Sequence, residues 1–556
     1  VFCEVFDAGL LGEHALPTIL HARQALLREG GLLIPACAQL FGQLVEAPKL
    51  LERFAVLHSP TGASLKGARL RNSERYSCET MSTIPHVKLT DPIPLVKLDF
   101  QEIEYLYSNL GNWIDPPVEL RATCAGIAQF LVYWWEIVLD TEGYCRINTA
   151  PEGGCESWEQ AVRPLAGWDS DECLRVTDGE LLHLHLRMQA DGIDVLLQDA
   201  KNSEDPVADV PDDDLVELQL EEEELMRFND TDHWQAVKEA MARALASLAP
   251  GSFVQLLDIS DALPLSLLLA PELCAAASRW DAVCCLRSRA EKQALLSLLA
   301  SSSLDADRVH ILLASAQQLI QAALPSPFPP NGAGAEAKLQ STPSASLVIC
   351  EDIVGASGAL RAEALEDLAL LWRTCSGRHG RELRVVPEAI VMKLSLIDSD
   401  ELERRTRVVE RPGGVDVSEV NALSVSDFLS LEEALLKPRY LCKEVEALSL
   451  PLGPSLLTAL AALSARENGA PLLRLRLTAE SPGKVHGIVT RFAWPGSAGH
   501  CWDKRLAGVL WPCEGRNRPP HLEVGDCVVV TVGYTPARGL VVTPVCLERT
   551  SGTNKK

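Results

Sequence analysis

The sequence predicts an α/β protein in which doubly wound parallel sheets are each followed by an antiparallel β-barrel, in two tandem modules. Strands and helices alternate after residue 230, as in a parallel sheet. Residues 36–200 instead carry the alternation and turn clusters of antiparallel strands. The opening stretch recurs near residue 347, which predicts a repeated module. We expect five parts, with bounds at 1–35, 36–200, 201–228, 229–400 and 401–556.

Composition sets the broad class of the protein. The 556 residues suffice for about three or four domains, and 47% apolar and 23% charged residues are ordinary for a globular chain. A net charge of −25 disfavours a nucleic-acid binder and favours cationic partners such as arginine-rich protein segments. A general contribution to solubility explains this charge equally well.

The cysteine pattern predicts a reducing compartment, the cytoplasm or the nucleus. The 17 cysteines are scattered, with no Cys-x-x-Cys pair, so no metal site is expected. No apolar run reaches about 20 residues. The longest, Ala262–Pro271, is broken by Pro264, so we expect no membrane span. Because Val1 already lies in a predicted core strand, we expect an upstream part to be missing.

Two carboxylates flank the first loop. Val1–Phe6 is predicted to be a buried strand end that carries Glu4, and Gly9 and Gly12 bracket a tight loop that carries Glu13. Two carboxylates on such a loop could bind one planar cation between them. A guanidinium is such a cation, and its forked N–H donors match the geometry of carboxylate oxygens. For an isolated glutamate pair, one buried strand acid and one solvated loop acid would be the favoured interpretation.

For the rest of the first module the sequence predicts one helix followed by strands. The predicted helix is 15–29, ended by Gly30 and Gly31, with a short strand at 32–34. Predicted antiparallel strands lie at 93–100, 130–139 and 181–188. The acidic stretch 201–228 has few apolar anchors and is predicted to be a solvated linker.

The second module begins with a helix at 233–248, capped near Asp230–Asp232. Strands are predicted at 253–259, 282–286 and 309–313, with a helix at 290–301. The loop after the first strand has no glycine, and Arg287 stands where an acid should bind ribose. We therefore expect this site to have lost cofactor binding. Residues 325–343 form a Pro-, Gly- and Ser-rich insertion.

The repeat preserves only half of the glutamate pair. Cys350 and Glu351 align with Cys3 and Glu4, but Leu360 stands at the position of Glu13. A pair with one carboxylate replaced by leucine cannot hold a guanidinium from two sides.

The residues around Glu4 and Glu13, with 33–46, resemble the double-glutamate region of the protein arginine methyltransferases, in particular their tandem-module members. The resemblance implies two Rossmann-like domains, each followed by a β-barrel, with the first truncated at its N-terminus. It implies S-adenosylmethionine as cofactor, held by residues upstream of Val1. Trp158 matches an aromatic residue of the family's substrate-arginine pocket. Glu156 and Ser157 replace that loop's Thr and His, which leaves a histidine-dependent role in doubt.

The activity that this resemblance implies is methyl transfer to arginine in protein substrates, RNA-processing proteins among them, with symmetric dimethylation. Glu4 and Glu13 would be the catalytic residues, and the second module a pseudo-catalytic partner in an intramolecular pseudo-dimer. The 556 residues alone are expected to be inactive. The alternative is a non-catalytic methyltransferase-like scaffold. A small-molecule methyltransferase is disfavoured because nothing else in the sequence marks a small apolar pocket.

Overall fold

The structure is a computed structural model in which the chain divides into two compact units. Unit 1 comprises residues 1–57 and 66–226, and unit 2 comprises 58–65 and 227–556. The structure describes residues 1–54, 56–57, 68–70, 76–140, 142–155, 157–165, 174–200, 218–220, 222–264, 266–275, 277, 279–301, 306–323, 345–355, 358–375, 382–407, 414–417, 420–421, 428–464, 473–495, 505–510 and 519–549.

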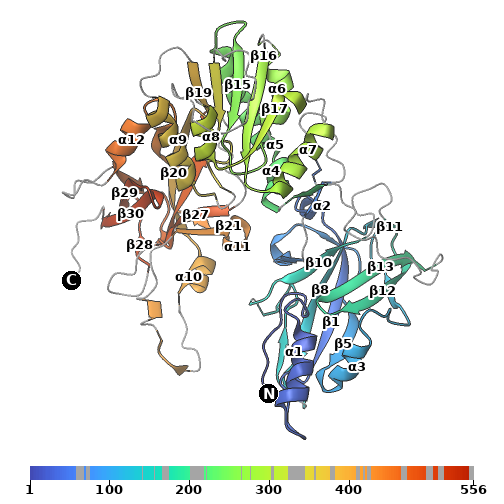
Figure 1. The fold of residues 1–556 in the computed structure, drawn as a ribbon. Helices are drawn as coiled ribbons and strands as arrows, with labels where there is room; N and C mark the ends of the chain where they lie inside the picture. The colour runs from blue at the N-terminus through green and yellow to red at the C-terminus, as the bar shows by residue number, and fades with distance from the viewer. Residues whose placement is uncertain are drawn as a thin grey trace. The chain divides into compact units, whose positions relative to one another are not determined.

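Unit 1 is built on an antiparallel sheet whose central strand is β1 (Cys37–Glu46). One side of β1 pairs with β5 and β4, and the other with β8, which continues to β9, β10 and β3 (Figure 1). These strands are β3 (Ser77–Glu79), β4 (Val87–Lys88), β5 (Ile93–Asp99), β8 (Phe130–Val138), β9 (Arg146–Asn148) and β10 (Gln160–Pro164). Two of them, β5 and β8, match the strands predicted at 93–100 and 130–139, and the strand predicted at 181–188 is present in a smaller sheet of the same unit.

Further strands and short helices complete unit 1. Its smaller sheets consist of β6 (Val118–Arg121) with β12 (Leu181–Gln189) and β13 (Gly192–Asp199), β7 (Gly126–Ile127) with β11 (Arg175–Val176), and β2 (Ala68–Leu70) with β14 (Leu218–Leu220). Its helices include α1 (Ala15–His21), α2 (Pro48–Leu51) and α3 (Ile103–Ser108), and α1 runs on into a π-helical turn over Ala22–Leu26. One apolar core joins residues of α1, α3, β1, β8 and β12.

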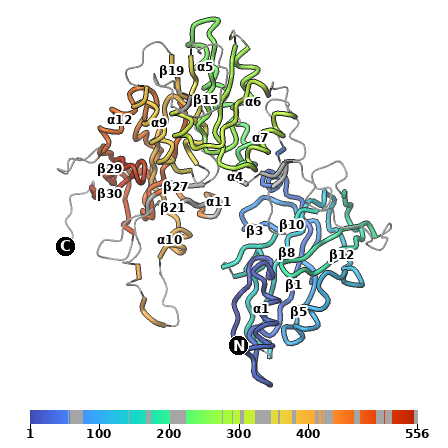
Figure 2. Tube along the Cα trace, in the orientation of Figure 1, coloured from blue at the N-terminus to red at the C-terminus, as the bar shows by residue number. Residues whose placement is uncertain are grey.

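Unit 2 begins with a parallel sheet of five strands in the order β17-β16-β15-β18-β19. The strands are β15 (Phe253–Asp258), β16 (Arg279–Leu286), β17 (Val309–Leu313), β18 (Ala345–Ile349) and β19 (Glu382–Val386). The helices that precede and connect them are α5 (Thr231–Ala246), α6 (Ser266–Leu273), α7 (Arg289–Ser301), α8 (Ala316–Ala323) and α9 (Ala362–Cys375), as Figure 2 traces. The reversal of strand order beside β15 confirms the predicted doubly wound sheet. The predicted cap is also present, since the Asp230 side chain accepts from His233 N at 2.8 Å.

An antiparallel sheet system follows in unit 2, centred on β20 (Ala389–Asp398). It contains β21 (Phe428–Glu432), β22 (Arg439–Tyr440), β23 (Val445–Pro451), β24 (Leu473–Thr478), β25 (Gly483–Lys484), β26 (Gly487–Ala493), β27 (Arg505–Leu510), β28 (His521–Leu522), β29 (Cys527–Thr535) and β30 (Gly539–Glu548), with helices α10 (Asp400–Thr406), α11 (Glu433–Leu436) and α12 (Leu456–Leu463). Because β20 pairs in antiparallel fashion with β22, β23 and β26, the boundary predicted at residue 400 is wrong. The antiparallel part begins near residue 388.

The two antiparallel systems pair in the same register. Val45 pairs with Lys88 in unit 1, and Ile397 pairs with Tyr440 in unit 2, each 352 residues further along the chain. Both β1 and β20 are ten residues long with the same alternation of buried and half-buried positions. Each also carries a bulge after its fourth residue, opposite β5 and β23. The repeat seen in the sequence therefore extends to individual backbone pairs.

Two local predictions in unit 1 are corrected. The strand predicted at Val1–Phe6 is reduced to one bridge between Phe2 and Ile34, and Phe2 is 74% exposed. In unit 2 the corresponding β18 has a strand on each side, whereas among the described residues Phe2 pairs on one side alone. The helix predicted to reach residue 29 ends at Leu26, which is exposed and therefore gains nothing from continuing the apolar face.

The predicted linker 201–228 ends in a helix, α4 (Glu222–Asn229). Its Leu225 and Phe228 are fully buried, and this burial supplies the apolar anchoring that the acidic composition obscured. Residues 201–217 and the insertion at 325–343 lie outside the described residues. Within the part that the structure describes, no helix has the length and apolarity needed to span a membrane.

Candidate functional site

The loop from Glu4 to Glu13 is anchored by its own apolar residues, which pack into the core of unit 1. Leu10 and Leu11 are fully buried in the core of unit 1, and Leu10 reverses the chain with a φ of 73°. A Cβ on Gly9 would lie 2.3 Å from the Tyr76 ring, and one on Gly12 would lie 2.3 Å from the Asp7 carboxylate. The two predicted loop glycines are therefore needed because they let the loop approach Tyr76 and Asp7, while the left-handed turn falls on Leu10.

Asp7 is the polar centre of this loop. Its carboxylate accepts a hydrogen bond from Gly12 N at 3.1 Å and a second from the hydroxyl of Tyr76, and its backbone carbonyl accepts from Leu10 N at 3.0 Å. Burial of the Tyr76 ring, and then its bond to Asp7, raise the pKa of Tyr76 above its usual range, so the hydroxyl stays a donor. These contacts fix the loop between its two glutamates.

Two tryptophans hold the same loop by hydrogen bonds, Trp135 from β8 and Trp158 from the turn before β10. Trp135 Nε1 donates to the carbonyl of Asp7, and Trp158 Nε1 donates to the carbonyl of Phe6, both at 2.8 Å. The two indoles contact each other edge to face, with centroids 5.1 Å apart. The sequence singled out Trp158 as part of a substrate pocket, and the structure shows the bond by which it holds the loop. Glu156 of the same segment lies outside the described residues.

The sequence did not predict a role for Asp7, Tyr76 or Trp135 in this loop. The close spacing of Gly9 and Gly12 was the one available sign that a bulky side chain approaches the loop. Which side chain it is depends on long-range packing: Tyr76 is 69 residues from Asp7, and Trp135 is 128 residues from it.

Glu4 and Glu13 themselves are exposed, at the two ends of the anchored loop. The neighbours of Glu4, Cys3 and Val5, pack against the core. Because side chains of an extended chain alternate, Glu4 faces away from that core. Among the described residues neither carboxylate has a hydrogen bond or ion pair, and no contact joins the two. Two free carboxylates on a fixed backbone are suited to accept N–H donors from a cation.

The corresponding loop of unit 2 lacks this arrangement. Val354 stands where Asp7 does, and it bridges to Leu360, the residue in place of Glu13. Leu360 and Val354 are buried, and so is Glu351, the counterpart of Glu4. This loop presents no pair of exposed carboxylates.

A cavity of about 380 Å³ lies at the carboxyl ends of the parallel strands in unit 2. Its lining includes Asp261 and Arg287, which form an ion pair with each other. Arg361 also contacts Asp261, at 2.7 Å. The acid that would hold a ribose at the end of β16 is thus replaced by an arginine, and the one nearby carboxylate on the loop after β15 is already paired. These residues do not fit a nucleoside cofactor.

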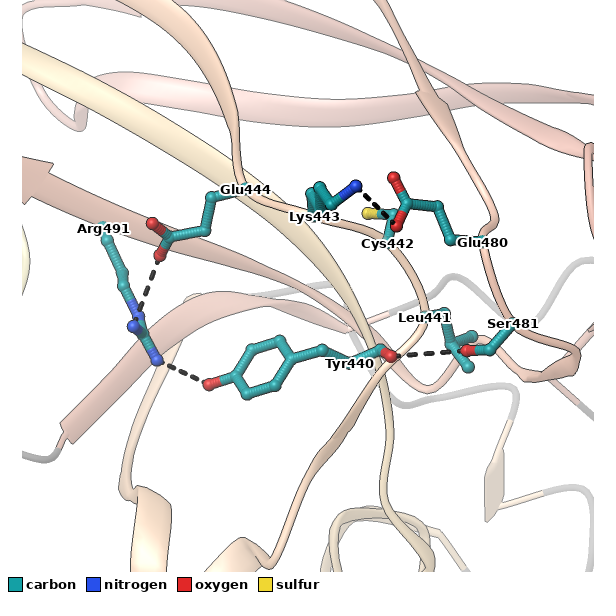
Figure 3. A pocket seen from close by; sticks show the side chains of 8 residues that line it. All are labelled: Tyr440, Leu441, Cys442, Lys443, Glu444, Glu480, Ser481 and Arg491. Carbon is teal, nitrogen blue, oxygen red and sulfur yellow. Dashed lines mark hydrogen bonds and ion pairs between the residues drawn. The ribbon is translucent and has the colours of Figure 1, made fainter.

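A second cavity in unit 2, about 540 Å³, is lined by charged residues that are paired with each other (Figure 3). Arg491 donates to the hydroxyl of Tyr440 at 2.5 Å and lies 3.3 Å from Glu444. Lys443 lies 3.4 Å from Glu480. Because these charges compensate one another, this cavity offers no obvious site for a charged ligand.

Comparison with known proteins identifies relatives of this chain. No family model matches it. An arginine N(omega)-methyltransferase of Streptomyces achromogenes is 31% identical over 189 residues, covering 33% of this chain and 47% of that protein. Protein arginine N-methyltransferase 9 of Mus musculus is 27% identical over 314 residues, covering 46% and 36%. Protein arginine N-methyltransferase 7 of Drosophila persimilis is 31% identical over 162 residues, covering 27% and 22%.

The chain resembles the protein arginine N-methyltransferases. Types 9 and 7 of that family, both among the relatives, agree with the resemblance found in the residues around Glu4 and Glu13. The chain matches less than half the length of each relative. A solved Trypanosoma brucei PRMT1 enzyme–prozyme complex with AdoHcy has a TM-score of 0.36 and 14% identity, covering 58% of this chain and 93% of that one. The fold of this chain is defined by its own strand pairing.

Proposed function

We propose that this chain is part of a protein arginine N-methyltransferase and that the loop of unit 1 binds the arginine to be methylated. The observation that carries the proposal is the anchored loop of Asp7, with two unpaired carboxylates, Glu4 and Glu13, at its ends. The similarity to arginine methyltransferases supports the assignment of guanidinium as the bound group.

The two glutamates would act by position and charge. Carboxylates on two sides of a planar guanidinium accept its N–H donors and hold positive charge on the bound nitrogens. The remaining nitrogen then keeps more electron density for attack, and its orientation is fixed. S-adenosylmethionine, when bound, supplies the methyl group. The new N–C bond would form as the S–C bond breaks, the sulfur would keep the bonding electron pair as a neutral thioether, and the nitrogen would release one proton to water.

We further propose that the two units are tandem modules with substrate-side β-barrels, of which the second is a non-catalytic partner. Three features support this: the common register of β1 and β20, the buried Glu351, and the Asp261–Arg287 pair in the parallel-sheet cavity. Symmetric dimethylation, protein substrates that include RNA-processing proteins, and a location in the cytoplasm or nucleus belong to the same proposal.

The test is methyl transfer from radiolabelled S-adenosylmethionine to an arginine-rich peptide, by a protein that includes any sequence encoded upstream of Val1. Glu13→Gln should lower the rate at least 100-fold, because one of the two carboxylates proposed to bind the guanidinium loses its charge. Glu29→Gln, an exposed acid further along unit 1, is the matched control and should leave the rate unchanged. Mass spectrometry of the product distinguishes symmetric from asymmetric dimethylation.

The second candidate function is a non-catalytic scaffold. It is favoured by unit 2, where Glu351 is buried and Asp261 is paired with Arg287. It predicts no transfer from wild type or from either variant. A third candidate is an enzyme that methylates free arginine, because the name of the Streptomyces relative does not specify a protein substrate. An assay with free arginine as acceptor tests this candidate. Transfer to free arginine but not to peptides would overturn the proposed substrate class.

A further inference from the structure

Glu351 of unit 2 occupies the same backbone position as Glu4. In unit 1, Cys3 N donates to the carbonyl of Ile34 at 2.9 Å, and in unit 2 Cys350 N donates to the carbonyl of Val386 at the same distance. Phe2 pairs with Ile34 in parallel, as Ile349 pairs with Val386. The glutamate that follows the cysteine is thus the corresponding residue in both units.

The surroundings of Glu351 differ sharply from those of Glu4. Its side chain is fully buried, and its backbone N–H donates to Ser260 Oγ at 3.1 Å. Burial of an ionised carboxylate is costly unless a cation or several donors accompany it. Leu360, at the position of Glu13, brings no charge.

The cation beside Glu351 is an arginine of the same chain. Arg227 on α4 is 4% exposed, and its Nη1 lies 3.8 Å from Glu351 Oε1. Its Nη2 donates to the carbonyl of Leu263 at 2.6 Å. The same guanidinium counteracts, together with Arg361, the rise that burial causes in the pKa of Asp352. It therefore lies in a buried acidic environment built from the loop after β18 and the loop after β15.

We propose that unit 2 retains a guanidinium-binding site around Glu351 and that Arg227 permanently occupies it. The site is then closed to substrate arginine by a side chain of the protein itself. The inference rests on the structure of unit 2 alone and holds whether or not the loop of unit 1 supports methyl transfer.

A purely structural ion pair is the competing explanation, and chemical rescue separates the two. Arg227→Ala removes the guanidinium and leaves space for a small ligand. Ethylguanidinium, at low millimolar concentrations that do not denature proteins, should bind there and raise the Tm of the variant. At about ten times the dissociation constant we expect a rise of roughly 2 °C. Ethylammonium, which lacks the planar fork, should give a smaller rise.

Two controls make the measurement specific. Arg243→Ala removes an exposed arginine of α5 that lies 3.9 Å from Glu239, so ethylguanidinium should leave its Tm unchanged, as it should for wild type. In Arg227→Ala/Glu351→Gln the rescue should be lost, because the carboxylate is gone. Equal shifts in the Arg227→Ala and Arg243→Ala variants, or rescue that survives Glu351→Gln, would overturn the proposal.

The test remains decisive if Arg227→Ala does not fold unaided. The variant is then refolded from denaturant with and without ethylguanidinium, and soluble folded protein is quantified by size-exclusion chromatography. Recovery with ethylguanidinium and not with ethylammonium supports a retained guanidinium site. Equal recovery in both, or recovery in neither, contradicts it.

Discussion

The indole nitrogen of Trp158 donates a hydrogen bond of 2.8 Å to the backbone carbonyl of Phe6, a residue that lies between Glu4 and Glu13 in the chain. A side chain 152 residues away thereby holds the loop that presents both glutamates. The shape of the candidate site depends on this and two further anchors, Trp135 and Tyr76.

Trp158→Phe tests this anchor. The variant keeps an aromatic ring against Trp135 and loses the donor, so the free energy of unfolding of unit 1 should fall by about 1 kcal/mol. Amide hydrogen exchange of residues 5–12 should become roughly fivefold faster, because the loop opens more often. Trp113→Phe, whose ring lies elsewhere in unit 1 beside Arg187, serves as the control. Unchanged exchange in the loop would show that the bond does not hold it.

Tyr76→Phe removes the donor to Asp7. The carboxylate then keeps Gly12 N as a partner and loses the hydroxyl, which should cost about 1–3 kcal/mol in urea unfolding. Since the pKa of Tyr76 is raised, the difference between wild type and variant should not change between pH 6 and 9. Tyr105→Phe, at an exposed ring, should have no effect. A difference that disappears within that pH range would contradict the assignment of a permanently protonated hydroxyl.

Gly9→Ala tests the close approach of the loop to Tyr76. The added Cβ would stand 2.3 Å from a ring carbon, so the loop or the ring must move, at a cost of about 1–3 kcal/mol. Gly453→Ala is the control, since no atom lies within 4 Å of its added Cβ. Thermal unfolding that shows equal Tm values for the two variants would mean that the loop adapts without strain.

Much of the fold follows from local patterns, as β17 illustrates, because Val309–Leu313 was predicted to the residue. The α5 helix likewise follows from apolar spacing and the cap at Asp230. The candidate site could be predicted from the sequence only in part. Glu4 and Glu13 were found by their resemblance to a known loop, whereas Tyr76, Trp135 and Arg227 act on residues far away in the chain. Their partners are set by tertiary packing, which has no signature within a short window of sequence.

Carboxyl groups buried near the carboxyl ends of the parallel strands in unit 2 predict that the stability of the protein depends on pH. Asp258 is buried at the end of β15, and burial, opposed by bonds from Ser266 and Ser260, raises its pKa to about 6. Between pH ~4 and 6 the folded chain therefore holds a proton that the unfolded chain releases. The free energy of unfolding should fall as pH rises through this window, by on the order of 1–3 kcal/mol.

Asp258→Asn should flatten this slope in urea unfolding of the whole chain measured at several pH values. Asp352 and Asp367, whose pKa values burial also raises, would account for the part that remains. Asp400→Asn, at an exposed position on α10, is the control and should keep the wild-type slope. Identical slopes for Asp258→Asn and wild type would refute a raised pKa for this carboxyl.

The central claim is that Glu4 and Glu13 hold one guanidinium together, and a double-mutant cycle of peptide affinity tests it most directly. The protein, including any sequence upstream of Val1, is titrated with an arginine peptide and with the same peptide carrying lysine. Glu4→Gln and Glu13→Gln should each weaken arginine-peptide binding by about tenfold or more. The double variant should lose clearly less than the product of the two single losses, because both carboxylates act on the same group. Losses that simply multiply, or equal losses for the lysine peptide, would contradict a shared grip on one guanidinium.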